Sequence, residues 1–310
     1  MKFSEFSKKY LELHAIPNKK SWRLDFKYIN RSILPEFGEL QLKSIKRLHV
    51  MEWHRRLSHE SGPYYANRAH SLIRTMFNCA IKWEILQGTN PATLVTRNKE
   101  KSRTDFISPD VLPRFLIALH VCRDKQVKAA ILFQLFSGLR PKEVRELQWE
   151  DINLISRTVR VRETKNGKDH LLPLTPVLQS VLQALPRQGQ WVFPGKQRNH
   201  PRNSFRKYWY KIRLSAGLPN LRLHDLRRTV GSYLAMDNFS DNIIRRILNH
   251  DSTEAVKVYT RFTLHPLEDA LNQHSEKIRH LATNAGLELP CFHHEVNEQS
   301  SQTHPLKLTA

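Results

Sequence analysis

The feature that most constrains this fold is a helical spacing of apolar residues, which gives way to strand-like alternation in one region. Apolar side chains recur every three or four positions through residues 1–91 and again beyond residue 106. Polar and apolar residues alternate over 158–162, and Asn166 with Gly167 forms a strong two-residue hairpin signal before a returning strand at 168–174. We therefore expect a mainly α fold with a small β-hairpin or sheet in its second half.

Changes in this periodicity suggest the domain boundaries. Residues 92–105 carry many charges and little apolar periodicity, which is typical of a linker. Its basic side chains could contact a polyanion or could simply keep the connector solvated. We expect a bundle of four or five helices over 1–91, a second domain over 106–275, and a tail over 276–310 that is partly disordered.

Prolines and glycines indicate where the helices end. Pro17 with Asn18 is expected to stop the first helix, and the second is expected to end at Leu34 and Pro35, because proline lacks a backbone N–H. A helix start with proline in its first turn is predicted at 106–110, and a buried helix at 126–137. The other helices predicted for the second domain begin at Pro141 and span 175–185, 201–216, 225–236, 240–248 and 252–262.

The chain is strongly basic, with 50 Lys and Arg residues against 29 Asp and Glu and a formal net charge of +21. Such an excess favours a polyanionic partner, since binding releases the counterions of the phosphates. Both predicted domains are basic and the tail is not, so we expect DNA contacts from two bodies. A ribosome-like or merely soluble basic protein is the alternative reading of composition alone.

Cysteine content and hydropathy indicate the compartment. The three cysteines show no CxxC spacing, which argues against a disulfide framework or a structural zinc site. No apolar run approaches the ~18 residues of a membrane span, and the N-terminus lacks the apolar core of a signal peptide. A reducing, cytoplasmic setting without membrane insertion is expected.

Arg140 is the first candidate for binding an anion. It directly precedes the helix start at Pro141, where backbone N–H groups and the helix dipole also favour negative charge. A guanidinium can hold two phosphate oxygens at once. The competing interpretation is an arginine that caps a neighbouring carbonyl.

His224 and Arg227 form a second candidate pair. They lie three residues apart at a helix start and share a face, whereas Asp225 and Arg228 point elsewhere and are expected to serve in structural pairs. A histidine beside an arginine suits proton handling at a phosphoryl oxygen. Taken alone, such a pair could equally be an ordinary helix surface.

The hairpin tip and the segment after residue 249 supply the remaining candidates. Lys165, just before the turn, could protonate a leaving oxygen, with Lys168 as the competing acid; turn lysines are usually solvated. His250 precedes a helix that carries Tyr259. A phenol of pKa ~10 is a poor nucleophile at neutral pH and needs nearby cations, whereas a buried tyrosine is usually a core residue.

In this order and on these local structures, the candidates resemble one family, the tyrosine recombinases or phage-type integrases. The resemblance covers about residues 1–275, and the early helices are similar to the family's core-binding domain. The motifs that carry it are GLRPKEVRELQWEDI (138–152), ETKNGKDHLLPL (163–174), LRLHDLRRTVGSYLA (221–235) and LNHDSTEAVKVYTRF (248–262).

The resemblance implies a SAM-like helical DNA-binding domain followed by a catalytic domain. It implies that Tyr259 attacks the scissile phosphate to form a 3′-phosphotyrosyl link, with Lys165 protonating the leaving 5′-oxygen. Glu143 matches an acidic position that braces the site. The others implied to act are Arg140 and Arg227 on the non-bridging oxygens, His250 as a hydrogen-bond donor to one of them, and His224 in proton transfer. No metal or cofactor is implied.

The implied partners are double-stranded DNA with specific recombination sites, a homo-tetramer assembled on it, and accessory bending or directionality proteins. The expected setting is the nucleoid of a bacterial host, and the core-binding pattern starts so early that no arm-binding domain is expected. The implied role is integration or excision of a phage or other mobile element. Alternatives are multimer resolution or inversion by the same chemistry, a non-catalytic DNA-binding regulator, and a metal-dependent nuclease using His293 and His294.

Overall fold

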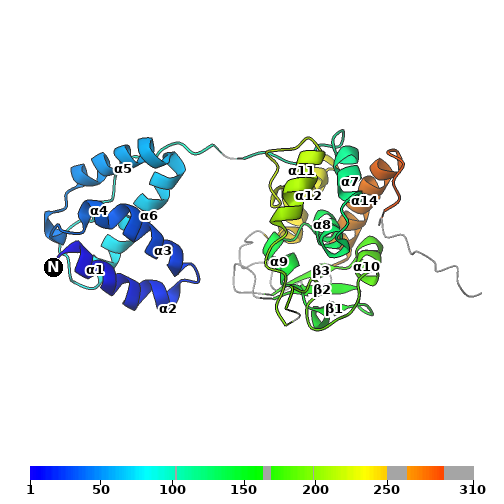
Figure 1. The fold of residues 1–310 in the computed structure, drawn as a ribbon, viewed down its shortest axis with the longest axis horizontal. Coiled ribbons are helices and arrows are strands. Elements are labelled where there is room, and N and C mark those ends of the chain that lie inside the picture. The colour runs from blue at the N-terminus through cyan, green and yellow to red at the C-terminus, as the bar shows by residue number, and fades with distance from the viewer. Residues whose placement is uncertain (102, 163–168, 198, 250–263, 290–310) are drawn as a thin grey trace, which may run out of the picture. The chain divides into compact units, whose positions relative to one another are not determined.

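The computed structural model describes residues 1–310 except 102, 163–168, 198, 250–263 and 290–310. It divides into two compact units, Met1–Arg103 and Thr104–Ala310 (Figure 1). Each unit has its own cluster of buried apolar side chains. Each unit is therefore described by itself.

The first unit is helical. Its two longest helices, α5 and α6, pack against each other, and Gly62 reverses the chain between them at φ +88°. Aromatic rings of Phe3, Phe37 and Phe77 meet in its core. The helices are α1 (Phe3–Tyr10), α2 (Ile16–Asn18), α3 (Trp22–Tyr28), α4 (Leu34–Phe37), α5 (Arg47–Ser61) and α6 (Pro63–Lys82).

The first helical path ends at Asn18 as predicted, whereas the second continues past Pro35 to Phe37. A π-helical stretch of five residues precedes each proline: η1 (Leu11–Ala15) leads into α2, and η2 (Ile29–Ile33) leads into α4. Pro17 and Pro35 then occupy the first turn of these short α-segments. In the first turn of a helical segment, a backbone N–H has no acceptor within that segment. The N–H that proline lacks is therefore not needed there, and the helical path continues through the proline.

The division between the units lies later than the predicted end of the first domain at residue 91. Ala92 and Val95 are buried in the first unit's apolar cluster. The backbone N–H of Asn98 donates to Oδ1 of Asn67 at 3.0 Å. The first part of the segment predicted as a linker thus packs on the first unit, because two apolar residues within it are enough to hold it there.

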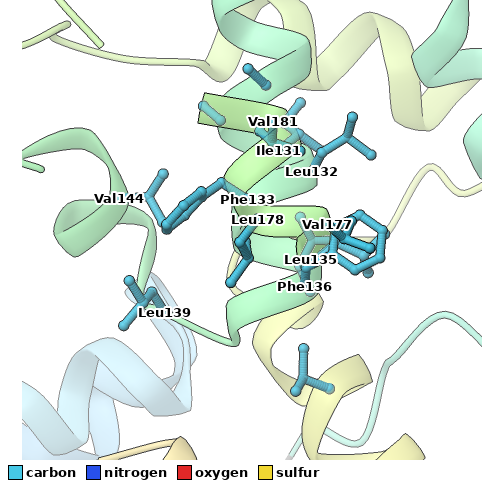
Figure 2. Close-up of a cluster of buried hydrophobic side chains, with 14 of the residues drawn as sticks. Ile131, Leu132, Phe133, Leu135, Phe136, Leu139, Val144, Val177, Leu178 and Val181 are labelled. Carbon is cyan, nitrogen blue, oxygen red and sulfur yellow. The ribbon is translucent and has the colours of Figure 1, made fainter. Parts of the chain in front are cut away.

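The second unit surrounds one central helix, α8 (Lys125–Ser137), which is buried along most of its length as predicted. It contacts α9 (Pro141–Arg145), α10 (Pro176–Gln183), α12 (Asp225–Met236) and α14 (His265–Thr283). Figure 2 shows its side chains, among them Ile131 and Phe133, packed with Val177 and Leu178 of α10. This all-round burial fixes the C-terminal end of α8, from which the chain enters the site.

The remaining helices within the described ranges lie close to their predicted positions, whereas the helix predicted at 252–262 lies outside the described residues. The helix expected from 106–110 begins later, at Leu112, and its first-turn proline is Pro113. These helices are α7 (Leu112–His120), α11 (Arg206–Ser215) and α13 (Asp241–Ile247), with the 3₁₀ turns η3 (Leu42–Ser44) and η4 (Trp149–Asp151) in the first and second units.

A small antiparallel sheet has the order β1 (Ile152–Asn153), β2 (Thr158–Val161) and β3 (His170–Pro173). The predicted hairpin strands are confirmed, with Val159 opposite Leu172 and Val161 opposite His170. The short strand β1 was not predicted. The turn at Asn166 and Gly167 lies outside the described residues.

The helix α14 runs past the predicted domain end at residue 275. Ile278 and Ala282 are buried in the core of the second unit, so the helix continues because its apolar face still has a surface to cover. The helix therefore packs on its own unit. None of the helices in the described ranges is long and apolar enough to cross a membrane.

Candidate active site

The site begins where α8 ends. Gly138 adopts the left-handed conformation, with φ +69°, and its N–H donates to the carbonyl of Gln134. A Cβ at this position would lie 2.9 Å from Cδ2 of Leu248 and 3.3 Å from Cγ1 of Val230. Glycine is therefore required both by the backbone and by the close approach of neighbouring helices. The turn places Arg140 directly before α9.

Glu143 determines how Arg140 is held. Its Oε1 accepts from Nη1 of Arg140 at 2.6 Å, and its Oε2 accepts from the backbone N–H of Arg140 at 2.8 Å. The expected helix start at Pro141 is present, but this carboxylate already engages the N–H beside it. The anion-binding capacity at this point therefore comes from the guanidinium, and Glu143 braces it as the resemblance implied.

Arg227 of α12 is almost completely buried, with 3% of its surface exposed. Its Nη1 donates to the carbonyl of Gly138 at 2.9 Å, while its Nη2 is buried and has no hydrogen-bond partner among the described residues. Burial, and then the nearby charge of Arg140, lower the pKa of Arg227 to about 10. Arg227 is thus a buried cation with one unused donor, beside the half-buried Arg140, and the carboxylate of Glu143 opposes the shift of its pKa.

His224 lies at the N-cap of the same helix, exposed at the edge of this positive cluster. Partial burial, and then the charges of Arg227 and Arg228, lower its pKa. Asp225 and Arg228, which were expected to serve in structural pairs, pair with each other, since Nη1 of Arg228 lies 2.8 Å from Oδ1 of Asp225. His224 therefore stays neutral near pH 7 and can accept a proton.

One histidine of the site was missed by sequence reasoning. His170, on β3, is half-buried, and its Nε2 lies 3.2 Å from the carbonyl oxygen of Ile247. Burial, with smaller contributions from Arg227 and Arg140, lowers its pKa to about 4, although this hydrogen bond and the charge of Glu143 oppose the shift. Strand periodicity could have found it, because residue 170 shares a face with the buried Leu172.

The end of α13 closes the described part of the site. Asn249 has φ +44°, and its carbonyl oxygen accepts from Nη2 of Arg140 at 3.0 Å. The next residue in the chain is His250. Three predicted site residues, His250, Tyr259 and Lys165, lie outside the described residues.

The described residues place two arginines, a bracing carboxylate and two neutral histidines around one point. Such an arrangement can bind an oxyanion between the two guanidinium groups and can exchange a proton with it. Within the described ranges, no three His, Cys, Asp or Glu side chains are grouped as a metal ion would require. His293 and His294, considered for a nuclease, lie outside those ranges.

Comparison with known proteins gives matches over both units. Residues 105–265 match the model of the phage integrase family, and residues 2–58 match its N-terminal SAM-like domain. A tyrosine recombinase of Pseudothermotoga lettingae is 24% identical over 76% of this chain and 85% of its own length. The shufflon-specific DNA recombinase of Escherichia coli is 26% identical over 67% of this chain and 54% of its own length.

Solved structures show the same fold. A lambda integrase dimer bound to a COC′ core site aligns with a TM-score of 0.68 and 19% identity, over 81% of this chain and 96% of that one. A lambda integrase tetramer bound to a Holliday junction aligns with a TM-score of 0.66 and 18% identity, over 83% and 80% of the two chains. Because the family model spans more than half of the sequence, the chain belongs to the phage integrase family, the tyrosine recombinases.

Proposed function

We propose that the protein is a site-specific DNA recombinase that cuts and rejoins duplex DNA through a 3′-phosphotyrosyl intermediate. The phenolate of Tyr259 attacks the scissile phosphorus, the bond to the 5′-oxygen breaks, and Lys165 supplies the proton that this oxygen takes up. The 5′-hydroxyl of another strand then attacks the phosphotyrosine and releases the tyrosine. The phosphodiester energy is conserved, so the scheme needs neither a nucleotide nor a metal.

The observation that carries this proposal is the buried Arg227, with an unpaired Nη2 donor, beside Arg140. An uncompensated buried cation is unfavourable unless an anion completes it. A phosphate between the two guanidinium groups would supply that anion, and the fixed donors would stabilise the extra charge of the pentacoordinate transition state. In this scheme His250 donates to one non-bridging oxygen and His224 assists proton transfer.

The net charge of +21 and the basic character of both units support duplex DNA as the substrate. We propose that four protomers assemble on two recombination sites, cleaving one pair of strands at a time, with accessory proteins where the DNA must bend. Integration or excision of a phage or other mobile element is the preferred role. Similarity to a shufflon recombinase and to the XerA recombinase of Pyrococcus horikoshii supports inversion or multimer resolution as the second candidate.

The test is a covalent trap. The full chain is incubated with nicked duplexes that tile the DNA on either side of its gene, in excess EDTA, and adducts are resolved on denaturing gels. We expect an adduct that Tyr259→Phe abolishes. The matched control is Tyr210→Phe, which changes an exposed tyrosine of the same unit and should leave the adduct in place.

Two outcomes would count against the proposal. An adduct that survives Tyr259→Phe would place the nucleophile elsewhere, and cleavage that requires a divalent metal would favour a nuclease. Sequencing the junctions formed in cells then separates the candidate roles. Inverted segments, resolved multimers and integrated elements leave different junctions although the chemistry is the same.

A further inference from the structure

Three consecutive residues at the end of α13 are each held by a different part of the second unit. The carbonyl of Ile247 meets Nε2 of His170 on β3 at 3.2 Å. The side chain of Leu248 packs in the core between two helices. The carbonyl of Asn249 accepts from Nη2 of Arg140 at 3.0 Å. The segment 247–249 is therefore fixed by polar contacts on either side of an apolar one.

The apolar contact depends on two glycines. A Cβ at Gly138 would lie 2.9 Å from Cδ2 of Leu248, and a Cβ at Gly231 of α12 would lie 3.0 Å from its Cδ1. Leu248 consequently fits against two backbones with no side chain between them. This close packing holds the side chain of Leu248, whereas the polar contacts hold the backbone carbonyls on either side of it.

His170 supplies the polar contact from the sheet. A backbone carbonyl can only accept, so Nε2 carries the proton and Nδ1 does not. The charged groups around it are Arg140 and Glu143 from the start of α9 and Arg227 from α12. Burial among two guanidinium groups favours the neutral ring, which donates to Ile247 without adding a third positive charge.

Arg140 depends on this segment for its orientation. Its guanidinium is held at two points, with Nη1 on Glu143 and Nη2 on the carbonyl of Asn249. Asn249 adopts φ +44°, a left-handed conformation that few residue types accept. If the end of α13 moves, the second acceptor moves with it, and the guanidinium plane is free to rotate.

We propose that His170 is a positioning residue for DNA cleavage: by holding Ile247 it fixes the carbonyl of Asn249 that orients Arg140. The effect on cleavage rests on the proposed function, whereas the contact itself does not. His170 acts through Arg140 and does not touch the phosphate. A misplacement of about 1 Å in a charge-stabilising group lowers the rate of reaction by roughly 100-fold, so this support has a measurable consequence.

The test uses a pair of variants in the full chain. His170→Gln keeps an N–H donor at a similar reach, and His170→Leu removes it while remaining apolar. His265→Leu is the matched control, because His265 lies exposed at the start of α14 and pairs with Asp269. Hydrogen exchange is followed first, without DNA, at the amides of Leu248 and Asn249, which donate to Ile244 and Arg246.

We expect exchange at these amides to be faster in His170→Leu and close to the wild-type rate in His170→Gln and His265→Leu. Unchanged exchange in His170→Leu would overturn the proposal, since His170 would then not hold the end of α13. This measurement does not depend on catalysis. It tests whether His170 holds the end of α13 even if the wild-type protein forms an adduct with none of the tiled duplexes. That failure would count against the proposed function and not against the contact.

Single-turnover adduct formation and duplex binding are then measured separately. His170→Leu should form the adduct roughly 10- to 100-fold more slowly while binding the same nicked duplex within about 2-fold of wild type. His170→Gln should restore most of the rate. A loss of duplex binding with an unchanged rate of adduct formation, or a glutamine variant as slow as the leucine variant, would overturn the positioning role.

Discussion

Two neighbouring arginines of α12 differ in burial and in pairing, and we expect one to serve catalysis and the other to serve stability. Arg227 is buried without a carboxylate partner among the described contacts of its guanidinium. Arg228 pairs with the buried carboxylate of Asp225. A buried carboxylate that loses its cation is destabilising, whereas an unpaired buried cation is itself a strain on the fold. The two residues should therefore respond differently to the same substitution.

We expect Arg227→Met to slow adduct formation by at least about 100-fold, because one fixed donor to the developing charge is lost. Its free energy of unfolding should be unchanged or higher, since a buried charge is replaced by an apolar side chain. Arg228→Met should instead lower the free energy of unfolding by roughly 1–2 kcal/mol. Denaturant unfolding and adduct yield, measured on both variants, check this; the opposite assignment would contradict it.

At the same scale, His170 shows why a site residue can escape sequence reasoning. The other histidines were recognised by their spacing from an arginine or a tyrosine within one motif. His170 belongs to the hairpin motif, in which Lys165 and Lys168 drew the attention. Its partner, Ile247, is 77 residues away in sequence, so the contact that gives it a role exists only after β3 and α13 have packed.

At the scale of elements, the helices follow local rules except where a second feature intervenes. The second helix was expected to end at Leu34 and Pro35, but the helical path continues through the π-helical stretch and Pro35 to Phe37. The helix α14 extends past residue 275 because its apolar face continues to cover the core. In both cases a neighbouring turn or surface, and not the propensity of one residue, decides the boundary.

The contact between α14 and α8 is pH-sensitive. Nε2 of His274 lies 2.9 Å from the carbonyl of Leu135, and the ring stands edge-on to Tyr233. Complete burial lowers the pKa of His274 to about 4; the hydrogen bond and the charge of Asp237 oppose this shift, and Lys277 adds to it. The unfolded chain, with a histidine pKa of ~6.5, therefore takes up a proton at a pH where the folded chain does not.

The stability that His274 contributes is thus complete above pH ~6.5 and is lost as the pH falls toward about 4. Between pH 7 and pH 5 this loss should be about 2 kcal/mol. His274→Gln keeps an N–H donor for Leu135 but does not titrate. Denaturant unfolding of both proteins at the two pH values checks the expectation; an equal pH dependence in the variant would show that His274 is not responsible.

At the scale of the whole molecule, each of the two units has its own core and a basic surface composition. Two basic bodies on one chain can bind the same duplex at two places, which raises the number of phosphates neutralised. The affinity of the intact chain for duplex DNA should therefore fall more steeply with salt concentration than the affinity of either unit alone.

We expect the logarithm of the binding constant for a duplex to fall more steeply with the logarithm of salt concentration for residues 1–310 than for fragments 1–103 or 104–310. Each additional phosphate contact should add about 0.9 to the slope. Fluorescence anisotropy with one labelled duplex at several salt concentrations measures this. A slope for fragment 104–310 equal to that of the intact chain would mean that the first unit makes no phosphate contacts.

The sequence by itself determined the fold class, the helical elements, the hairpin strands and the candidates Arg140, His224 and Arg227. These depend on periodicity, on turn residues and on side chains a few positions apart, all of which are local properties. The structural role of Asp225 and Arg228 could be predicted for the same reason, and the structure pairs them with each other.

The tertiary structure decided which of these groups share a site and what state they are in. The pKa of Arg227 falls because α12 is buried against the turn that carries Arg140, and His170 gains a partner because β3 meets the end of α13. Glu143 accepts a hydrogen bond from Arg140 within one turn, but the second acceptor for the Arg140 guanidinium is the carbonyl of Asn249, 109 residues further on. Burial and long-range contact arise only from packing, which local sequence patterns do not encode.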